Sequence, residues 1–260
     1  MNKMPLWVRF VHGDQTGFGI LSGATIQVHE GSVFDAPVST PLTLALDEVK
    51  LLIPCVPSKM IALWNNFHAL AAKLDVIKPD SPLYLLKGNN SFLAHGETIV
   101  RPKSYAGPVA FEGELGIVIG KRCKEVSENE AADCIFGYTC VNDVTAAAVL
   151  KENPTFDQWT RAKSYDTFGV FGPAIATDVD PLQCSVRTIL NGAERQNYPL
   201  SDMIIPPHRM ISQISYDMTL MPGDVICCGT SLGVGSMKEK TNTIEVAIEG
   251  IGTLSNIFEN

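Results

Sequence analysis

Two glutamates stand two residues apart at the start of an apolar run, Val109-Ala-Phe-Glu-Gly-Glu-Leu-Gly-Ile-Val-Ile-Gly120. On an extended strand Glu112 and Glu114 point to the same side, while the large apolar side chains of the run fill the other side. Two carboxylates at the end of a buried strand repel each other and are costly to desolvate unless a cation compensates them. The pair therefore indicates a cation site. The alternative is a frayed strand end at which both glutamates reach water.

A third carboxylate, Asp143, ends a second apolar segment, Gly137-Tyr-Thr-Cys-Val-Asn-Asp143. Together with Glu112 and Glu114 it would make an all-oxygen site, which suits Mg²⁺ or Mn²⁺ better than zinc. The alternative is that Asp143 caps a helix that begins near Thr145. A zinc site is set aside because the seven cysteines include no Cys-x-x-Cys pair, and we interpret them as reduced, buried thiols.

Two lysines follow or accompany apolar segments. Lys87 ends the run Leu83-Tyr-Leu-Leu-Lys87, and Lys163 lies in an aromatic stretch between Gln158 and Phe168. An ammonium group beside a metal site would hold an anionic substrate. The alternative for each lysine is a stem that lies along apolar surface while its ammonium group stays in water.

Two further residues are candidates for binding or catalysis. Thr230 follows an apolar strand in a glycine-rich loop, where its hydroxyl and the backbone amides could bind a carboxylate. The loop lacks the Gly-x-x-x-x-Gly-Lys pattern of a phosphate-binding loop. His68 falls on a predicted helix directly after an apolar strand, where it could equally be a packing residue. No Gly-x-Ser-x-Gly motif accompanies it, so a serine-hydrolase triad has no support.

Strands dominate the elements that must position these residues. Helices are expected at 65–74, 128–135 (opened by a Ser127/Glu130 capping box), 146–152 and 207–217. Strands are expected at 83–87, 114–119, 138–142, 185–190, 224–227, 243–248 and 253–258. Asn191-Gly192 is typical of a hairpin turn. Strands and helices do not alternate regularly, which disfavours a doubly wound sheet and favours an α+β, strand-dominated fold.

The first 56 residues have a different pattern from the rest of the chain. Short alternating runs with turns near Gly13 and Gly23 predict a small strand meander, and a proline-punctuated stretch follows. We therefore predict a small β-rich domain over residues 1–56 and a catalytic domain over residues 57–260.

Composition limits the classes of partner. The 260 residues are 45% hydrophobic, enough for a large core. The 28 acidic and 20 basic side chains give a net charge of −8, which disfavours nucleic acid. No apolar run approaches the roughly 20 residues of a membrane span, so no membrane partner is expected. The chain begins without an apolar leader, and a cytoplasmic location is the default expectation.

Taken together, the segments resemble the fumarylacetoacetate hydrolase family from about Pro57 to Phe258. The first 56 residues also resemble the small β-rich domain that many members carry. The segments that carry the resemblance, in order, are Lys59-Met-Ile-Ala-Leu63, Leu83-Tyr-Leu-Leu-Lys87, Phe111-Glu-Gly-Glu-Leu-Gly-Ile-Val-Ile-Gly-Lys121, Gly137-Tyr-Thr-Cys-Val-Asn-Asp-Val-Thr145, Gln158-Trp-Thr-Arg-Ala-Lys-Ser-Tyr-Asp-Thr-Phe168, Pro222-Gly-Asp-Val-Ile226 and Gly229-Thr-Ser-Leu-Gly-Val-Gly235.

The resemblance implies a mixed β-roll, a homodimer and a small-molecule oxo-acid substrate. It implies that a divalent cation is held by Glu112, Glu114 and Asp143. It further implies that Lys163 contacts the substrate or its developing enolate and that Thr230 binds the substrate carboxylate, with Lys87 and Gln158 as further substrate contacts. Members act on 2-oxo acids, 1,3-diketones and their enols, in which a chelated dicarbonyl acts as an electron sink.

The chain departs from the family pattern at two motifs. Family hydrolases typically show Asn-Tyr-x-x-His-x-x-Glu, whose His and Glu activate water. Here His68 is kept, but Ala71 stands in place of the Glu and Trp64 in place of the Asn. The family's Asp-Val-Thr-Ala-Arg-Asp becomes Asp143-Val-Thr-Ala-Ala-Ala148, so that an anion contact is either lost or supplied by Arg161.

We therefore expect a Mg²⁺- or Mn²⁺-dependent decarboxylase or keto-enol isomerase acting on a 2-oxo or enol dicarboxylate. This resembles the family branch that acts on 5-oxopent-3-ene-1,2,5-tricarboxylate and 2-hydroxyhepta-2,4-diene-1,7-dioate, and neither reaction needs the missing Glu. The alternatives are an acylpyruvate or fumarylpyruvate hydrolase, with water activated by His68 alone or through another carboxylate, and a non-catalytic protein that binds metal and ligand.

Overall fold

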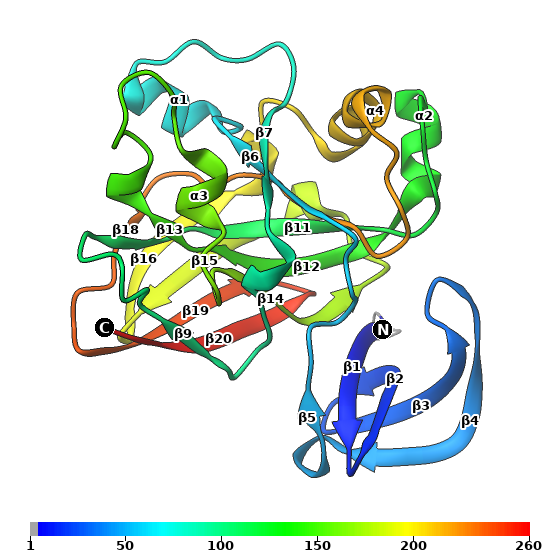
Figure 1. The fold of residues 1–260 in the computed structure, drawn as a ribbon. Helices are drawn as coiled ribbons and strands as arrows, with labels where there is room; N and C mark the ends of the chain where they lie inside the picture. Colours follow the sequence, from blue (N-terminus) through cyan, green and yellow to red (C-terminus); the bar gives the residue numbers. More distant parts are fainter. Residues whose placement is uncertain (1–4) are drawn as a thin grey trace.

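The computed structural model describes residues 5–260, so the first four residues of the predicted N-terminal domain lie outside it. Within that range strands dominate and form three sheets, with a few short helices along one side of the larger part of the molecule (Figure 1). This confirms the predicted α+β, strand-dominated class. No helix of the described range is long and apolar enough to cross a membrane.

The N-terminal residues form the antiparallel meander that the alternating pattern predicts. Its turns pass through Gly13 and Gly23, whose φ angles of +57° and +64° suit glycine. Buried side chains from β1, β3 and β4 form a small core together with Ala174, which belongs to the main part of the molecule. Its strands are β1 (Leu6–His12), β2 (Gln15–Ser22), β3 (Thr25–Ser32) and β4 (Asp35–Ala45), and β5 (Lys50–Leu51) pairs with β1.

The meander continues into the main sheet, because β1 pairs with β14 through Leu6 and Trp7. The strand order of this sheet is β4-β3-β2-β1-β14-β12-β11-β17-β6-β7, and β8 pairs with β14 at its side. Its further strands are β6 (Met60–Trp64), β7 (Leu83–Lys87), β8 (Phe92–Leu93), β11 (Gly113–Ile119), β12 (Ile135–Asp143), β14 (Gly169–Ala176) and β17 (Val225–Cys227).

Two smaller sheets accompany the main sheet in residues 5–260. One has the order β13-β10-β18, and the other has the order β16-β15-β19-β20-β9. The predicted turn at Asn191-Gly192 joins β15 to β16. The strands are β9 (Thr98–Val100), β10 (Val109–Phe111), β13 (Thr145–Ala146), β15 (Ser185–Leu190), β16 (Ala193–Pro199), β18 (Gly235–Ser236), β19 (Thr241–Ile248) and β20 (Gly252–Glu259).

Residues 5–260 contain four α-helices and six 3₁₀ turns, all of them short. The α-helices are α1 (His68–Leu74), α2 (Glu128–Ala131), α3 (Trp159–Lys163) and α4 (Pro207–Asp217). The six 3₁₀ turns are η1 (Leu46–Glu48), η2 (Asn89–Ser91), η3 (Ala132–Cys134), η4 (Ala147–Val149), η5 (Pro181–Gln183) and η6 (Leu200–Asp202).

Helix predictions succeeded to different degrees. The helix at 207–217 is confirmed, as is the Ser127/Glu130 capping box that opens α2. The helix expected from Asn65 begins at His68, because Asn65 has a φ of +58°, which no helical residue adopts. The helix expected at 146–152 is wrong: Thr145 and Ala146 pair with β10 as a strand, and only the turn η4 follows. The helix α3 was not predicted.

The β11 strand is the centre of the core. All seven of its residues are buried, with Leu115, Ile117 and Ile119 in the main apolar cluster and Val118 in a second cluster on the opposite face. The alternation predicted from the sequence is therefore confirmed. Because β11 is covered on both faces, polar side chains at its start have little access to water and must find partners within the protein.

Candidate metal centre and adjoining cavity

Three carboxylates converge where β11 and β12 meet. One oxygen each from Glu112, Glu114 and Asp143 lies within 4.8 Å of the other two. Gly113 pairs with Asn142 across the two strands, which brings Glu114 and Asp143 to the same end of the sheet. Glu112 lies between β10 and β11, and its backbone N–H donates a hydrogen bond to Asn142 Oδ1 at 3.1 Å. The local strand register therefore gathers the three predicted carboxylates.

Both predicted lysines reach this cluster. Lys163 Nζ donates to Glu112 Oε2 at 2.8 Å and to Asp143 Oδ2 at 2.5 Å, and Lys87 donates to the other oxygen of Asp143. Lys163 and Lys87 are only 3% and 2% exposed, so the alternative of lysines that extend into water is wrong for both. The alternative role of Asp143 as a helix cap is also wrong, because Thr145 and Ala146 form a strand rather than a helix.

The opposite charges set the protonation of the cluster. Burial alone would raise the pKa of Asp143, but the ammonium groups of Lys163 and Lys87 outweigh it and hold that pKa below its ordinary value. Burial alone would lower the pKa of Lys163, yet Asp143, Glu112 and Glu114 raise it above its ordinary value. In this cluster Lys163 is a cation that donates hydrogen bonds to two of the carboxylates.

Glu114 is the residue with the fewest partners in the cluster. It is fully buried, so the frayed-strand alternative is wrong for it, whereas the Glu112 side chain keeps 18% of its surface exposed. Gly229 N–H donates to Glu114 Oε2 at 2.8 Å, but Oε1 has no hydrogen-bond partner within residues 5–260. Burial first, and then the charges of Asp143 and Glu112, raise the pKa of Glu114 well above its ordinary value.

A divalent cation fits these residues. The donor set is all oxygen, which suits Mg²⁺ or Mn²⁺. With all three carboxylates ionised, the cluster and its two lysines carry one net negative charge, and a buried carboxylate oxygen without a donor points to a missing positive partner. The oxygen ligands do not separate the two metals.

Thr230 lies beside the cluster, with its hydroxyl already engaged. It donates to the Gly113 carbonyl at 2.9 Å and accepts from Gln196 at 2.8 Å. Tyr198 donates to the same carbonyl at 2.6 Å. A Cβ at residue 113 would lie 2.0 Å from the Thr188 hydroxyl, so only glycine fits between the two glutamates. These contacts brace the segment that carries the carboxylates.

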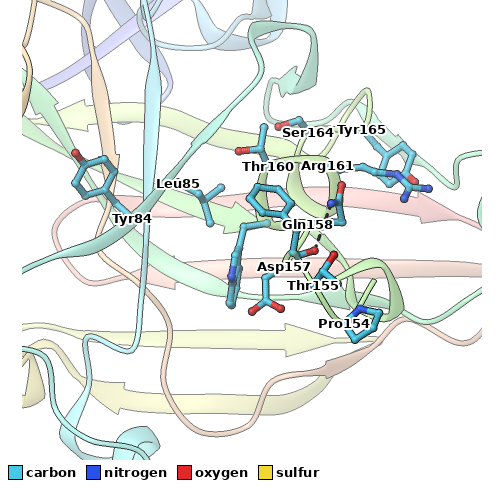
Figure 2. A pocket seen from close by; sticks show the side chains of 12 residues that line it. Tyr84, Leu85, Pro154, Thr155, Asp157, Gln158, Thr160, Arg161, Ser164 and Tyr165 are labelled. Carbon is cyan, nitrogen blue, oxygen red and sulfur yellow. Dashed lines mark hydrogen bonds between the residues drawn. The ribbon is translucent and has the colours of Figure 1, made fainter. Parts of the chain in front are cut away.

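The other predicted site residues lie around the cluster rather than in it. His68 is half-buried at the start of α1. The preceding Asn66 donates to the Cys228 carbonyl at 2.9 Å, next to the Gly229 amide that binds Glu114. Gln158 and Arg161 line a cavity of about 940 Å³ between β7 and the segment that leads into α3 (Figure 2). Arg161 is paired with Glu152 at the surface.

Sequence reasoning missed three groups that complete the cluster. The Thr145 hydroxyl donates to Glu112 at 2.9 Å and accepts from Lys163 at 2.9 Å. The Gly229 amide donates a hydrogen bond to the Glu114 carboxylate, and the Asn142 side chain accepts one from the Glu112 backbone N–H. Thr145 and Gly229 both fall within the segments that carry the family resemblance, which was the available signal. A backbone amide has no sequence signature of its own.

Comparison with known proteins identifies the family. Residues 59–259 match the fumarylacetoacetate (FAA) hydrolase C-terminal family. The chain belongs to this family. Residues 6–54 match a second family described as Rv2993c-like, N-terminal. The predicted boundary at residue 56 falls between the two matched ranges and stays a prediction.

Three relatives of this family member show the range of activities. A crystal structure of 2-hydroxyhepta-2,4-diene-1,7-dioate isomerase from Mycobacterium marinum is 38% identical, covers 98% of both chains and has a TM-score of 0.89. Oxaloacetate tautomerase YisK from Bacillus subtilis is 35% identical, over 82% of this chain and 74% of its own length. Maleylpyruvate hydrolase from Sphingobium sp. SYK-6, solved with manganese(II) and pyruvate, is 26% identical, covers 98% and 99% of the chains and has a TM-score of 0.79.

Proposed function

We propose that the protein is a Mg²⁺- or Mn²⁺-dependent enzyme that catalyses keto-enol isomerisation or decarboxylation of a 2-oxo or enol carboxylate. The observation that carries the proposal is Glu114, a buried carboxylate with an unpartnered oxygen beside Glu112, Asp143 and the cationic Lys163. Similarity to a 2-hydroxyhepta-2,4-diene-1,7-dioate isomerase and to an oxaloacetate tautomerase supports this reaction type.

Glu112, Glu114 and Asp143 would hold the cation. When bound, it would polarise the substrate carbonyl and stabilise negative charge that develops on oxygen. Lys163 is held between Glu112 and Asp143 as a permanent cation, and we propose that it donates a hydrogen bond to the same developing charge. Lys87 offsets the charge of Asp143 from the opposite side. Thr230 donates to the Gly113 carbonyl, and we propose that the glycine-rich loop to which it belongs contacts the substrate carboxylate.

Isomerisation needs a group that moves a proton from carbon to oxygen, and we propose His68 for it. Asn66, two residues before His68, donates to the Cys228 carbonyl and so ties the chain before α1 to the loop that carries Gly229. Ala71 is buried one turn later, so this helix offers no carboxylate to activate water at that position. Decarboxylation requires no water either, because the electron pair of the broken C–C bond becomes the enolate.

The second candidate is an acylpyruvate-type C–C bond hydrolase. It is favoured by the retained His68 and by the similarity to maleylpyruvate hydrolase. A non-catalytic role in binding metal and ligand is the third. The homodimer and the small-molecule substrate stay predictions.

Product analysis separates these candidates. The protein is incubated with oxaloacetate, an acylpyruvate and a 2-hydroxydienoate, each with Mn²⁺ and each with a chelator. Metal-dependent CO₂ release, or a change in enol absorbance without cleavage, is expected. Release of two acids from the acylpyruvate would make the protein a hydrolase. A metal-dependent rise in melting temperature without any turnover would favour the binding protein.

A further inference from the structure

A second cavity, of about 530 Å³, has mostly apolar walls. The Trp64 and Trp159 rings, with centroids 5.6 Å apart, form part of its lining. Leu83, Leu85, Ala147 and Leu150 supply further apolar surface. None of these residues belongs to the proposed metal ligands, and the cavity therefore has a separate role to explain.

The elements that carry the two lysines also carry the walls of this cavity. Leu85 precedes Lys87 by two residues on β7, so the two side chains lie on one face, about 7 Å apart along the strand. Trp159 precedes Lys163 by four residues on α3, one helical turn or about 6 Å away. Because both lysines end at Asp143, the two elements that line the cavity also reach the charged cluster.

The charges in the cavity lining do not favour a second carboxylate. Lys151 and Asp157 are both in the lining, but they pair with each other at 2.5 Å. Ala147 stands where the family motif has an arginine, and Trp64 stands where family hydrolases have an asparagine. Both differences place apolar surface in the same cavity. Arg161 lines the neighbouring larger cavity, where it is already paired with Glu152.

We propose that this cavity binds an apolar group, branched or aromatic, at the end of the substrate remote from its 2-oxo carboxylate. The inference rests on the proposed function, which places the 2-oxo acid at the carboxylate cluster. It narrows the substrate class to 2-oxo or enol acids with an apolar remote end. An uncompensated carboxylate in the same position would lose its hydration without gaining a cation.

Two probes of matched shape test the proposal. In 5-methyl-2-oxohexanoate a branched apolar group replaces the second carboxylate of 2-oxoglutarate. Calorimetric titration of the Mn²⁺-loaded protein should show at least about tenfold tighter binding of the apolar probe, the scale at which apolar pockets discriminate. Equal binding, or tighter binding of 2-oxoglutarate, would overturn the proposal.

A charge placed in the cavity should reverse this preference. Ala147 is exposed, so Ala147→Arg can be accommodated without displacing the core. It should tighten binding of 2-oxoglutarate and weaken binding of 5-methyl-2-oxohexanoate. The matched control is Ala148→Arg, which adds the same charge at the next exposed residue, outside this cavity lining, and should keep the wild-type preference. An equal response of both variants would also count against the proposal.

Pyruvate, which has no remote group, separates failure of this inference from failure of the proposed function. Wild-type protein with Mn²⁺ should bind pyruvate and exchange its methyl protons with deuterated water, and the control variant Ala148→Arg should not change that binding more than about twofold. Exchange of the pyruvate methyl protons, together with equal binding of 5-methyl-2-oxohexanoate and 2-oxoglutarate, would contradict only the role assigned to the cavity. A lack of both pyruvate binding and exchange, with no turnover of the three substrates above, would remove the proposed function.

Discussion

Two buried carboxylates on neighbouring strands have opposite surroundings. Asp224 directly precedes β17, and Glu114 lies on β11, which pairs with β17. Both side chains are fully buried. Asp224 accepts four hydrogen bonds: from the Ser58 hydroxyl and the Lys59 amide at one oxygen, and from the Met221 amide and the Lys59 ammonium at the other. Glu114 accepts one, from Gly229.

The contrast shows what distinguishes a structural carboxylate from a candidate ligand. Burial is the same for both residues, so burial alone identifies neither. Both oxygens of Asp224 have hydrogen-bond donors within the protein. Its role is to fix the turn before β17 to the segment before β6. Glu114 keeps one oxygen without a donor, and the cost of burying it is offset only when an external positive group arrives.

Glu114→Gln should produce the largest change. The amide keeps the shape of the side chain but removes a charged ligand, so metal affinity and metal-dependent turnover should fall more than about 100-fold. The fold should persist, because the substitution removes an uncompensated buried charge. Manganese titration and circular dichroism measure the two effects, with Glu30→Gln, on the remote strand β3, as the control. Wild-type turnover in Glu114→Gln would exclude Glu114 as a ligand.

Asp224→Asn should have the converse effect. The amide cannot accept all four hydrogen bonds and leaves the Lys59 ammonium uncompensated, so the free energy of unfolding should fall by about 3 kcal/mol. Urea unfolding of the metal-free protein measures this loss. Metal affinity of the folded variant should equal that of the wild type. A loss of metal affinity without a loss of stability would reverse the distinction between the two carboxylates.

Lys163→Met should separate catalysis from metal binding. Removal of the ammonium group takes away a donor for the developing charge, so turnover should fall roughly 100-fold. Metal affinity should stay the same or increase, because Glu112 and Asp143 lose a competing cation. Steady-state kinetics and metal titration of the same preparation measure both quantities. Parallel losses of turnover and metal affinity would assign Lys163 to support of the metal site alone.

Lys50→Met should have the smallest effect, because its ion pair with Glu97 is largely exposed. The hydrogen bond from Lys50 is the main cause of the lowered pKa of Glu97. A carboxyl group whose pKa is lowered by folding stabilises the protein at pH values above its ordinary pKa. This stabilisation is lost as the pH falls through the lowered pKa. The variant should lose less than about 1 kcal/mol at neutral pH, and the difference should vanish in acid. Urea unfolding across pH tests this, with exposed Lys103→Met as the control.

From the sequence, the positions of the strands were predicted better than the side-chain contacts of the site. Alternation along β11 and the hairpin at Asn191-Gly192 depend on local pattern, and both were confirmed. The helix expected at 146–152 failed because pairing of Thr145 and Ala146 with β10 overrides a local helical pattern. Lys87 and Lys163 were singled out, but their common contact with Asp143 depends on tertiary structure, which joins residues 56 and 20 positions away from it.

The pairing of β1 with β14 has a consequence for shortened forms of the chain. Along one edge of β14, β8 covers Gly169 and Val170, and β1 covers Ile175 and Ala176. A chain that began at residue 57 would leave the second half of that edge with free backbone amides and carbonyls beside apolar side chains. Open strand edges of this kind pair with other molecules. The N-terminal meander therefore also protects the catalytic sheet against edge-to-edge aggregation.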